Sequence, residues 1–154
     1  METAHVRRTL GFLLRENSRL MRRRFVHHAR KSGLLLNLSE ASLLSQVWHE
    51  PGISQARIAW LLDLETISVV RLVDSLERAE LLERRPHPKN RRIRTLWLTP
   101  AAETAVAQVR RITDIVRREA LADISKAERE QLLDTLLTLR SNLHAAEMAQ
   151  SAAA

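Results

Sequence analysis

The chain has 154 residues and a formal net charge of +7 at pH 7, a length typical of one domain and a charge that favours polyanionic partners. It contains no cysteine, which excludes disulfides, thiolate metal sites and cysteine-based oxidant sensing within the chain. No apolar run reaches membrane-spanning length and no signal peptide opens the sequence, so we expect a cytoplasmic protein with no membrane partner.

A first helix is predicted over about residues 6–31, because apolar residues recur there at helical spacing. These residues are Leu10, Leu13, Leu14, Met21 and Phe25. The other faces are basic and include the run 22–24, RRR. This run could approach DNA phosphates, bind an anionic ligand, or form a solvated flank beside a partner helix, and the residues leave these alternatives open.

A second helix is predicted to begin after an N-cap at Ser39 and to end before the Pro-Gly pair at 51–52. Trp48 on this helix and Trp60 on the next are expected in the core, because both helices have an apolar face to fill. Trp97, in a later strand, is expected to pack back on the helices.

The next stretch has the pattern of a helix-turn-helix. Ser54 is a good N-cap for a short first helix, and Ile53 and Ile58 occupy the two positions of a hydrophobic staple. After a short turn, Thr66 can cap a longer second helix, which is predicted to end near Glu80.

This longer helix has two different faces. At about 100° per residue, one arc holds only aliphatic residues, namely Val69, Leu72, Val73 and Leu76. The opposite arc begins with Ile67, Ser68 and Arg71 and continues with Asp74, Ser75 and Arg78. Arg71 could reach a guanine edge, Ser68 a base or phosphate, and Ile67 a thymine methyl in a major groove. Taken alone, the helix fits equally well as an ordinary amphipathic helix with a solvated polar face.

Residues 82–85 and 93–98 are predicted strands of a hairpin with a basic tip. Between residues 84 and 94 there are six basic residues and no acidic one: Arg84, Arg85, Lys89, Arg91, Arg92 and Arg94. A loop of this kind cannot reduce its own repulsion by internal pairing, but it can displace counterions from phosphates. Arg91 or Arg92 could also enter a minor groove, where the potential is most negative.

Two further helices are predicted in the rest of the chain. Thr99 and Pro100 are suited to the N-cap and first position of a long helix, and the capping box at residues 125–128 starts the last one. The first has a stripe made of Ala102, Ala105, Val106, Val109, Ile112, Val116 and Ala120. The second has an apolar face made of Leu132, Leu133, Leu136, Leu137 and Leu143. Apolar faces of this length predict a homodimer interface, and the end after Glu147 is expected to fray.

The sequence offers little support for an enzyme or a metal site. His49 and Glu50 precede a Pro-Gly pair that breaks the helix a zinc-protease motif needs, and His27 and His28 are adjacent, so their rings do not share a helical face. We therefore expect no catalytic residues, no metal and no cofactor. Two classes remain: a sequence-specific regulator of transcription, and an architectural or helical interaction protein that binds nucleic acid without sequence preference.

Several short motifs occur together in one third of the chain. They are Ile53-Ser54-Gln55, Ile58-Ala59, Leu76-Glu77, Glu80-Leu81, Pro88-Lys89-Asn90-Arg91-Arg92 and Leu98-Thr99. In this order they resemble the winged helix-turn-helix core of the MarR family of transcriptional regulators, nearest its SlyA-like branch. The order of the flanking helices extends the resemblance to nearly all of the chain.

Three positions depart from the family pattern. Glu80 stands where the family usually has glycine, and a left-handed cap there would cost about 1–2 kcal/mol, so the helix is expected to end differently. Asn90 replaces an aspartate that commonly fixes an arginine, and His87 stands where another acid is frequent. Arg91 is therefore expected to be less rigidly aimed.

The resemblance implies a mainly α fold with a small β-wing. It assigns residues 1–35 to an N-terminal dimerisation helix, 36–99 to the winged helix-turn-helix and 100–154 to C-terminal dimerisation helices. It also implies a homodimer on a pseudo-palindromic operator of double-stranded DNA. The candidate DNA-binding residues are Ser54, Gln55, Thr66, Ile67, Ser68, Arg71, Ser75, Lys89, Arg91 and Arg92.

Small-ligand control is a further implication of the resemblance. The expected effector is an aromatic carboxylate or a phenol lodged between the winged region and the dimer helices. Arg15 and Arg19, one helical turn apart, are candidate partners for its carboxylate, with surface solvation as the alternative.

Overall fold

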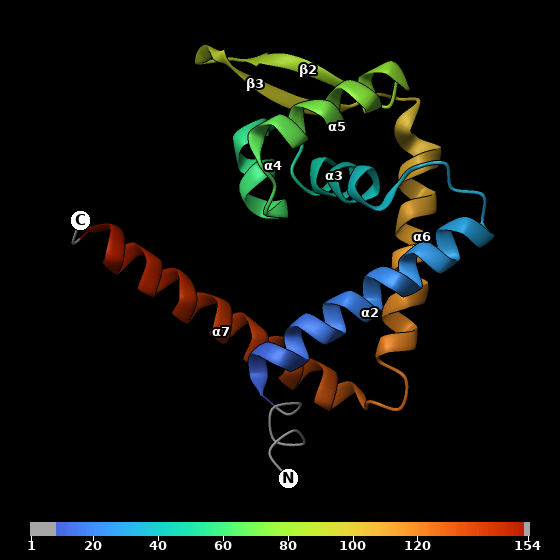
Figure 1. Cartoon of the computed structure of the whole chain (residues 1–154), viewed down its shortest axis with the longest axis vertical. Helices are drawn as coiled ribbons and strands as arrows, with labels where there is room; N and C mark the ends of the chain where they lie inside the picture. The colour runs from blue at the N-terminus through green and yellow to red at the C-terminus, as the bar shows by residue number, and fades with distance from the viewer. Residues whose placement is uncertain (1–8, 153–154) are drawn as a thin grey trace. The chain divides into compact units, whose positions relative to one another are not determined.

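The computed structural model describes residues 9–152, without the side chain of residue 91 or those after Gln150 (Figure 1). The chain divides into two compact units, one ending at Val116 and the other beginning at Arg117. The helices and strands are, in chain order, α2 (Leu10–Lys31), α3 (Leu38–His49), β1 (Ile53–Ser54), α4 (Gln55–Leu62), α5 (Thr66–Arg78), β2 (Leu82–His87), β3 (Asn90–Leu98), α6 (Ala102–Ala120) and α7 (Lys126–Ala152). This confirms the predicted fold class, mainly α with a small β-wing. Within residues 9–152, no helix combines the length and the apolar character needed to cross a bilayer.

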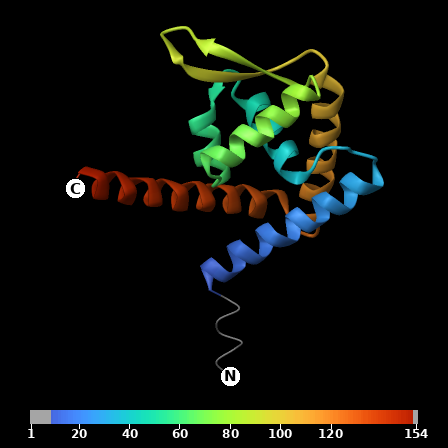
Figure 2. The same cartoon turned by 45° about the horizontal axis from the view of Figure 1, so that its top comes forward.

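The winged region, α3 to β3, has one apolar core. Helices α3, α4 and α5 pack against a three-stranded antiparallel sheet in the order β1-β3-β2 (Figures 1 and 2). Every one of these elements contributes buried aliphatic residues, which are Leu43, Leu44, Val47, Ile53, Ile58, Val69, Val73, Leu76, Leu82 and Leu96. The aliphatic arc predicted for α5 therefore lies in or against this core.

Helix α3 begins two residues earlier than a cap at Ser39 would allow. Its N-cap is Asn37, whose side-chain oxygen accepts a hydrogen bond from the Glu40 N–H at 3.0 Å. The Glu40 carboxylate accepts one from the Asn37 N–H, also at 3.0 Å. The prediction of Ser39 as the cap was wrong, because this reciprocal box satisfies two free donors of the first turn and a lone serine satisfies one.

The two helices of the helix-turn-helix begin differently. Ser54 caps α4 as predicted, with its Oγ accepting a hydrogen bond from the Arg57 N–H at 3.2 Å. In α5 the N-cap is Glu65, which makes no side-chain capping bond, and Thr66 is the first helical residue. The predicted cap at Thr66 was therefore wrong by one position.

Glu80 adopts the left-handed conformation in spite of its side chain, with φ at 59°. Its N–H donates to the Glu77 carbonyl at 2.9 Å, and the Leu81 N–H donates to the Leu76 carbonyl at 3.0 Å. These two bonds form a Schellman motif, which closes α5. The expectation that α5 ends differently was wrong, because the motif satisfies otherwise free carbonyls and turns the chain into β2.

The wing strands are longer than predicted. β2 reaches His87 and β3 begins at Asn90, which leaves only residues 88–89 as the turn. Pro86 pairs with Arg94, and the register shifts between Pro86 and His87. β2 is an edge strand, where a residue without an N–H is tolerated, so the two prolines do not force the long loop that the sequence suggested.

A second apolar cluster joins α2, α3 and α6. Its buried members are Phe25, Ala29, Ala41, Val109, Ile112 and Val116. Ala102 and Val106 of the predicted α6 stripe are buried as well. The interpretation of this stripe as a dimer face was wrong, because most of it is already buried within the first unit.

Helix α2 nevertheless keeps apolar residues on its surface. Between 41% and 58% of each of these residues is exposed: Leu10, Leu13, Leu14, Leu20 and Met21. The predicted start of this helix near Val6 lies outside the described residues, which begin at Thr9.

The tryptophans Trp48 and Trp60 were predicted in the core, and this was wrong. Trp60 is 54% exposed and Trp48 is 38% exposed. The Arg57 guanidinium lies 4.5 Å from the Trp60 ring centroid, and that of Arg110 lies 4.1 Å from the Trp48 centroid. Leucine, valine and isoleucine fill the core of the winged region, and these two indole rings pack against arginine instead.

The second unit contains the end of α6 and all of α7. The predicted capping box is confirmed: the Glu128 carboxylate accepts from the Ser125 N–H at 2.9 Å, and Ser125 Oγ accepts from the Glu128 N–H at 3.3 Å. α7 stays helical to Ala152, beyond the point where fraying was expected. Its exposed large apolar residues are Leu132, Leu133, Leu137, Leu143 and Met148.

Candidate nucleic-acid interface

Helix α5 presents the face that the sequence predicted. Ile67 is 54% exposed, Arg71 is exposed and Ser68 is half-buried between them and the core. On the other side of the helix, Val69 and Val73 are fully buried. An exposed isoleucine beside an arginine and a serine, near the N-terminal end of the helix, has the shape and chemistry of a major-groove probe.

The start of α4 contributes two further candidates. Ser54 is half-buried, and its hydroxyl oxygen serves as the helix cap. The Gln55 side-chain nitrogen is buried and has no hydrogen-bond partner among the described residues. Thr66, at the start of α5, is exposed.

Ser75 lies on the same side of α5 as Arg71, one turn further along. Its hydroxyl donates a hydrogen bond to the Glu40 carboxylate at 2.7 Å. The structure thus brings the predicted DNA-contacting residue Ser75 into contact with the first turn of α3. Sequence analysis overlooked Glu40, although Asn37 and Glu40 have the spacing of a capping box.

Arg84 connects the wing to α5. Its guanidinium forms ion pairs with Glu77 and, at 2.7 Å, with Asp74, and its backbone N–H donates to Glu77 at 2.8 Å. Its side chain is only 21% exposed. The view that the wing's basic residues have no internal partner was wrong for Arg84, because the acids that pair with it lie on α5, outside the hairpin sequence.

Arg85 is also paired. It forms an ion pair with Glu83, and its guanidinium lies 4.9 Å from the Trp97 ring centroid. Trp97 is half-buried, donates to Thr95 Oγ1 at 3.0 Å and lies over Gly52, where an added Cβ would approach the ring to 2.8 Å. The indole thus lies against the turn before β1 and against the wing itself, and its expected packing on the helices stays a prediction.

The tip of the wing carries the remaining positive charge. Lys89, Arg92 and Arg94 are exposed, whereas the side chain of Arg91 lies outside the described part of the structure. The Asn90 side-chain oxygen accepts from the Arg92 N–H at 3.1 Å, so Asn90 shapes the backbone of the turn. The tip therefore has exposed cations, while the base of the wing is held by Arg84.

Comparison with known proteins finds similar sequences and similar folds. A model described as MarR family matches residues 36–93. YdgJ of Bacillus subtilis (strain 168), an uncharacterised HTH-type transcriptional regulator, is 27% identical over 109 residues, which are 71% of this chain and 66% of YdgJ. The transcriptional regulator PA3341 is 28% identical, with a TM-score of 0.77 over 88% of this chain and 98% of that one. These matches relate the chain to the MarR family of transcriptional regulators, in sequence over the winged region and in fold over most of its length.

Two other solved structures have the same fold. SlyA is 25% identical, with a TM-score of 0.71 over 85% of this chain and 93% of that one, in agreement with the SlyA-like motifs. BpsR of Bordetella bronchiseptica, solved for the regulation of its DNA binding by 6-hydroxynicotinic acid, has the same fold at 18% identity and a TM-score of 0.72, over 87% of this chain and 94% of that one. The match to YdgJ spans just under two thirds of that relative.

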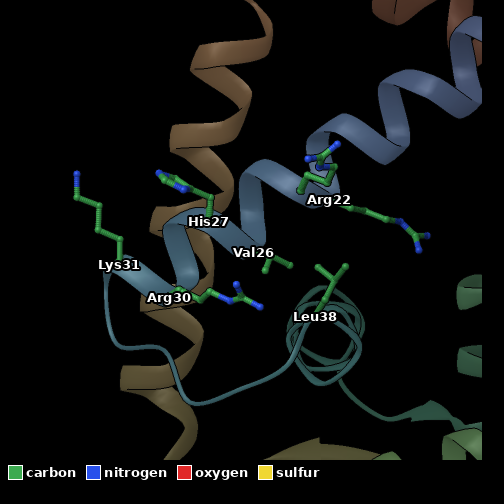
Figure 3. Close-up of a pocket in the computed structure, with 7 residues that line it drawn as sticks. Arg22, Val26, His27, Arg30, Lys31 and Leu38 are labelled. Carbon is green, nitrogen blue, oxygen red and sulfur yellow. The ribbon is translucent and has the colours of Figure 1, made fainter.

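A basic groove lies between α2 and the start of α3 (Figure 3). Its volume is about 640 Å³, and its lining residues are Arg22, Arg23, Val26, His27, Arg30, Lys31 and Leu38. Figure 3 shows Val26 and Arg30 extending toward Leu38, while Lys31 extends away from it. The groove combines aliphatic side chains with several cations, which suits an amphipathic anion.

The predicted effector partners lie elsewhere on α2. Arg15 is exposed, and Arg19 pairs with Glu16 at 3.6 Å on the helix surface. Neither lines the basic groove, nor a second cavity of about 730 Å³ between α2 and α6 that includes Gln108 and Arg111. Within residues 9–152, no three or more histidine, aspartate or glutamate side chains gather as a metal site would require.

Proposed function

We propose that this protein is a homodimeric, sequence-specific DNA-binding regulator of transcription. The observation that carries the proposal is that the two candidate DNA-contacting elements, α5 and the wing, are joined to each other. Helix α5 exposes Ile67 and Arg71, and the ion pairs of Arg84 connect the wing to that helix. A helix in the major groove and a hairpin over the adjacent minor groove must keep a fixed separation to bind together. A regulator of this kind must reach chromosomal DNA, so we include a cytoplasmic location in the proposal.

The contacts divide into base recognition and backbone binding. Arg71 would form paired hydrogen bonds with a guanine, Ile67 would touch a thymine methyl and Ser68 a base edge or phosphate. Ser54, Gln55 and Thr66 lie at helix starts, where N–H groups and short polar side chains favour phosphate. Lys89, Arg91 and Arg92 of the wing tip would bind phosphates or enter the minor groove. While the Ser75 hydroxyl donates its proton to Glu40, it has no proton to donate to a DNA phosphate.

The homodimer is supported by exposed apolar residues on α2 and on α7. Leu10 and Leu133 are each about three-fifths exposed, at 58% and 60%. Exposed apolar residues along each of two long helices favour association with a second copy of the same chain. Two copies could then occupy half-sites about one helical turn of DNA apart, roughly 34–36 Å.

Control by a small aromatic carboxylate or phenol is the last part of the proposal. The basic groove has cations for a carboxylate and aliphatic side chains for an aromatic ring. BpsR, which has the same fold, is a protein whose DNA binding is regulated by 6-hydroxynicotinic acid. A thermal-shift screen with benzoate, salicylate and 6-hydroxynicotinic acid tests it, since binding to the folded state alone raises the melting temperature. Loss of the shift in Arg30→Ala would place the ligand in the groove, and loss in Arg15→Ala/Arg19→Ala would place it at the sequence-predicted pair. No shift with any of the three acids would contradict control by this class of ligand.

DNA binding is tested with duplexes selected from a random pool and with scrambled versions of the same composition. We expect the selected duplex to bind at least about a thousandfold more tightly. Arg71→Ala should weaken that binding by about 1–3 kcal/mol and leave the scrambled duplex much less affected. Arg140→Ala, which removes an exposed arginine of α7, is the matched charge control.

The alternative is an architectural protein that binds any duplex. The net charge of +7 and the basic wing tip favour this alternative, because attraction to phosphates does not depend on base sequence. In that case the selected and scrambled duplexes would bind alike, and Arg71→Ala would weaken both equally. Lys89→Ala should lower the salt dependence of binding by about one counterion under either function.

A further inference from the structure

The carboxylate of Glu40 connects two helices that have different tasks. One oxygen accepts from the Asn37 N–H at 3.0 Å and so closes the capping box of α3. The other accepts from the Ser75 hydroxyl of α5 at 2.7 Å. The two partners are separated by 38 positions along the chain, so the contact exists only in the folded winged region.

Ser75 lies on the same side of α5 as Arg71, so its contact with Glu40 bears on how α5 is oriented. Arg71 lies four residues earlier, so both side chains lie on one side of the helix. On the wing side, α5 is also held by Arg84 through Asp74 and Glu77. On the side of α3, its buried contacts with the core are aliphatic, through Val69, Val73 and Leu76. Apolar packing is non-directional, and it fixes the rotation and sliding of a helix less sharply than a hydrogen bond between two defined atoms.

We infer that Glu40 is a positioning residue, which holds α5 at the rotation that presents Ser68 and Arg71 outward. The capping box keeps the Glu40 carboxylate in place, and its free oxygen then fixes Ser75. Charge-assisted hydrogen bonds of this kind are shorter and stronger than neutral ones, in accord with the 2.7 Å distance. The inference rests on the proposed function only where it concerns DNA, because the positioning itself is a property of the free protein.

Two pairs of variants of the full chain separate positioning from a direct DNA contact. Ser75→Ala removes the contact and leaves the capping box intact, whereas Ser75→Thr keeps a hydroxyl. Glu40→Ala removes both bonds, whereas Glu40→Gln keeps an acceptor for Asn37 and an amide that can donate to Ser75. Asn37→Ala is the control that weakens the cap of α3 without removing either member of the Glu40–Ser75 pair.

The first measurement is backbone hydrogen exchange of the free protein. Ser75→Ala and Glu40→Ala should each speed exchange in α5 by about fivefold or more, because local opening becomes easier when a charged hydrogen bond is lost. Ser75→Thr and Glu40→Gln should restore most of the protection, and Asn37→Ala should act on the first turn of α3 only. Unchanged exchange in α5 for Ser75→Ala would overturn the inference even if Glu40→Ala failed to fold.

The second measurement is a double-mutant cycle in the affinity for the selected duplex. If Glu40 acts through Ser75, each single alanine variant weakens binding about five- to tenfold and the double variant is no weaker than either. If Ser75 instead bonds DNA directly, Ser75→Ala weakens binding to the same extent with and without Glu40, which overturns the positioning role. Failure of the unaltered protein to bind any duplex would count against the proposed function, and hydrogen exchange would still decide the role of Glu40.

Discussion

The winged region and helix α7 differ in what covers their apolar side chains. In the winged region, Leu44 and nine other aliphatic residues are buried against one another. In α7, Leu133 is 60% exposed and the other large apolar residues on its surface are between 43% and 71% exposed. The winged region therefore has a core of its own within the chain, whereas α7 carries apolar surface that a further copy of the protein could cover.

The largest effect should come from the core of the winged region. Leu44→Ala should lower the free energy of unfolding by about 2–5 kcal/mol, because the side chain is fully buried and its removal leaves a cavity. Leu133→Ala should cost less than about 1 kcal/mol and should mainly weaken self-association. Urea unfolding followed by tryptophan fluorescence, with sedimentation velocity at several concentrations, measures both. Equal losses of stability would show that α7 belongs to the same core, and the contrast between the regions would then be wrong.

Within the winged region, the base and the tip of the hairpin should respond differently. Arg84→Met should lower the free energy of unfolding by about 1–3 kcal/mol, since Glu77 and Asp74 would lose a charged partner that is mostly buried. It should also weaken DNA binding at every salt concentration, because the wing is released from α5. The measurements are urea unfolding and fluorescence anisotropy with labelled duplex.

Arg92→Ala is the matched change at the tip. Its side chain is exposed, so we expect no loss of folding stability and a drop in the salt slope of DNA binding by about one counterion. A large loss of stability in Arg92→Ala, or none in Arg84→Met, would contradict the division of the wing into a holding base and a binding tip.

The sequence predicted the order of the elements and the outward face of α5, because helical periodicity is a local signal. The predictions failed for side chains whose contacts are with residues distant in the sequence. The acids that pair with Arg84 lie on another element, and the α6 stripe is covered partly by α2, which no pattern within α6 reveals. The prediction that Trp48 and Trp60 are buried also failed. The sequence shows which residues are apolar, but it does not show which of them the core has room for.

The joint between α5 and the wing allows a sharper test. Glu80 is left-handed there, which costs a residue with a Cβ about 1–2 kcal/mol, and glycine carries no such cost. Glu80→Gly should therefore stabilise the protein by about 0.5–1 kcal/mol, after the greater flexibility of glycine in the unfolded chain is included. Ala79→Gly is the control, because Ala79 has φ at −81° and gains nothing from the change. Thermal unfolding should move in opposite directions for the two variants, and a loss of stability in Glu80→Gly would contradict the Schellman ending of α5.

The smallest effect belongs to the start of α7. Hydrogen bonds from the side chain and backbone of Ser125 hold the pKa of Glu128 below its usual value. A carboxylate with a lower pKa in the folded state adds stability that is fully present above its unfolded pKa and is lost as the pH falls through the folded pKa. The cap of α7 should therefore weaken only in acid, below about pH 4.5, the ordinary value for the group. Helix content followed by circular dichroism should show this loss in the unaltered protein and a smaller one in Glu128→Gln, which keeps a neutral capping side chain at every pH. An identical acid response in both proteins would mean that the ionised form of Glu128 contributes nothing to the cap.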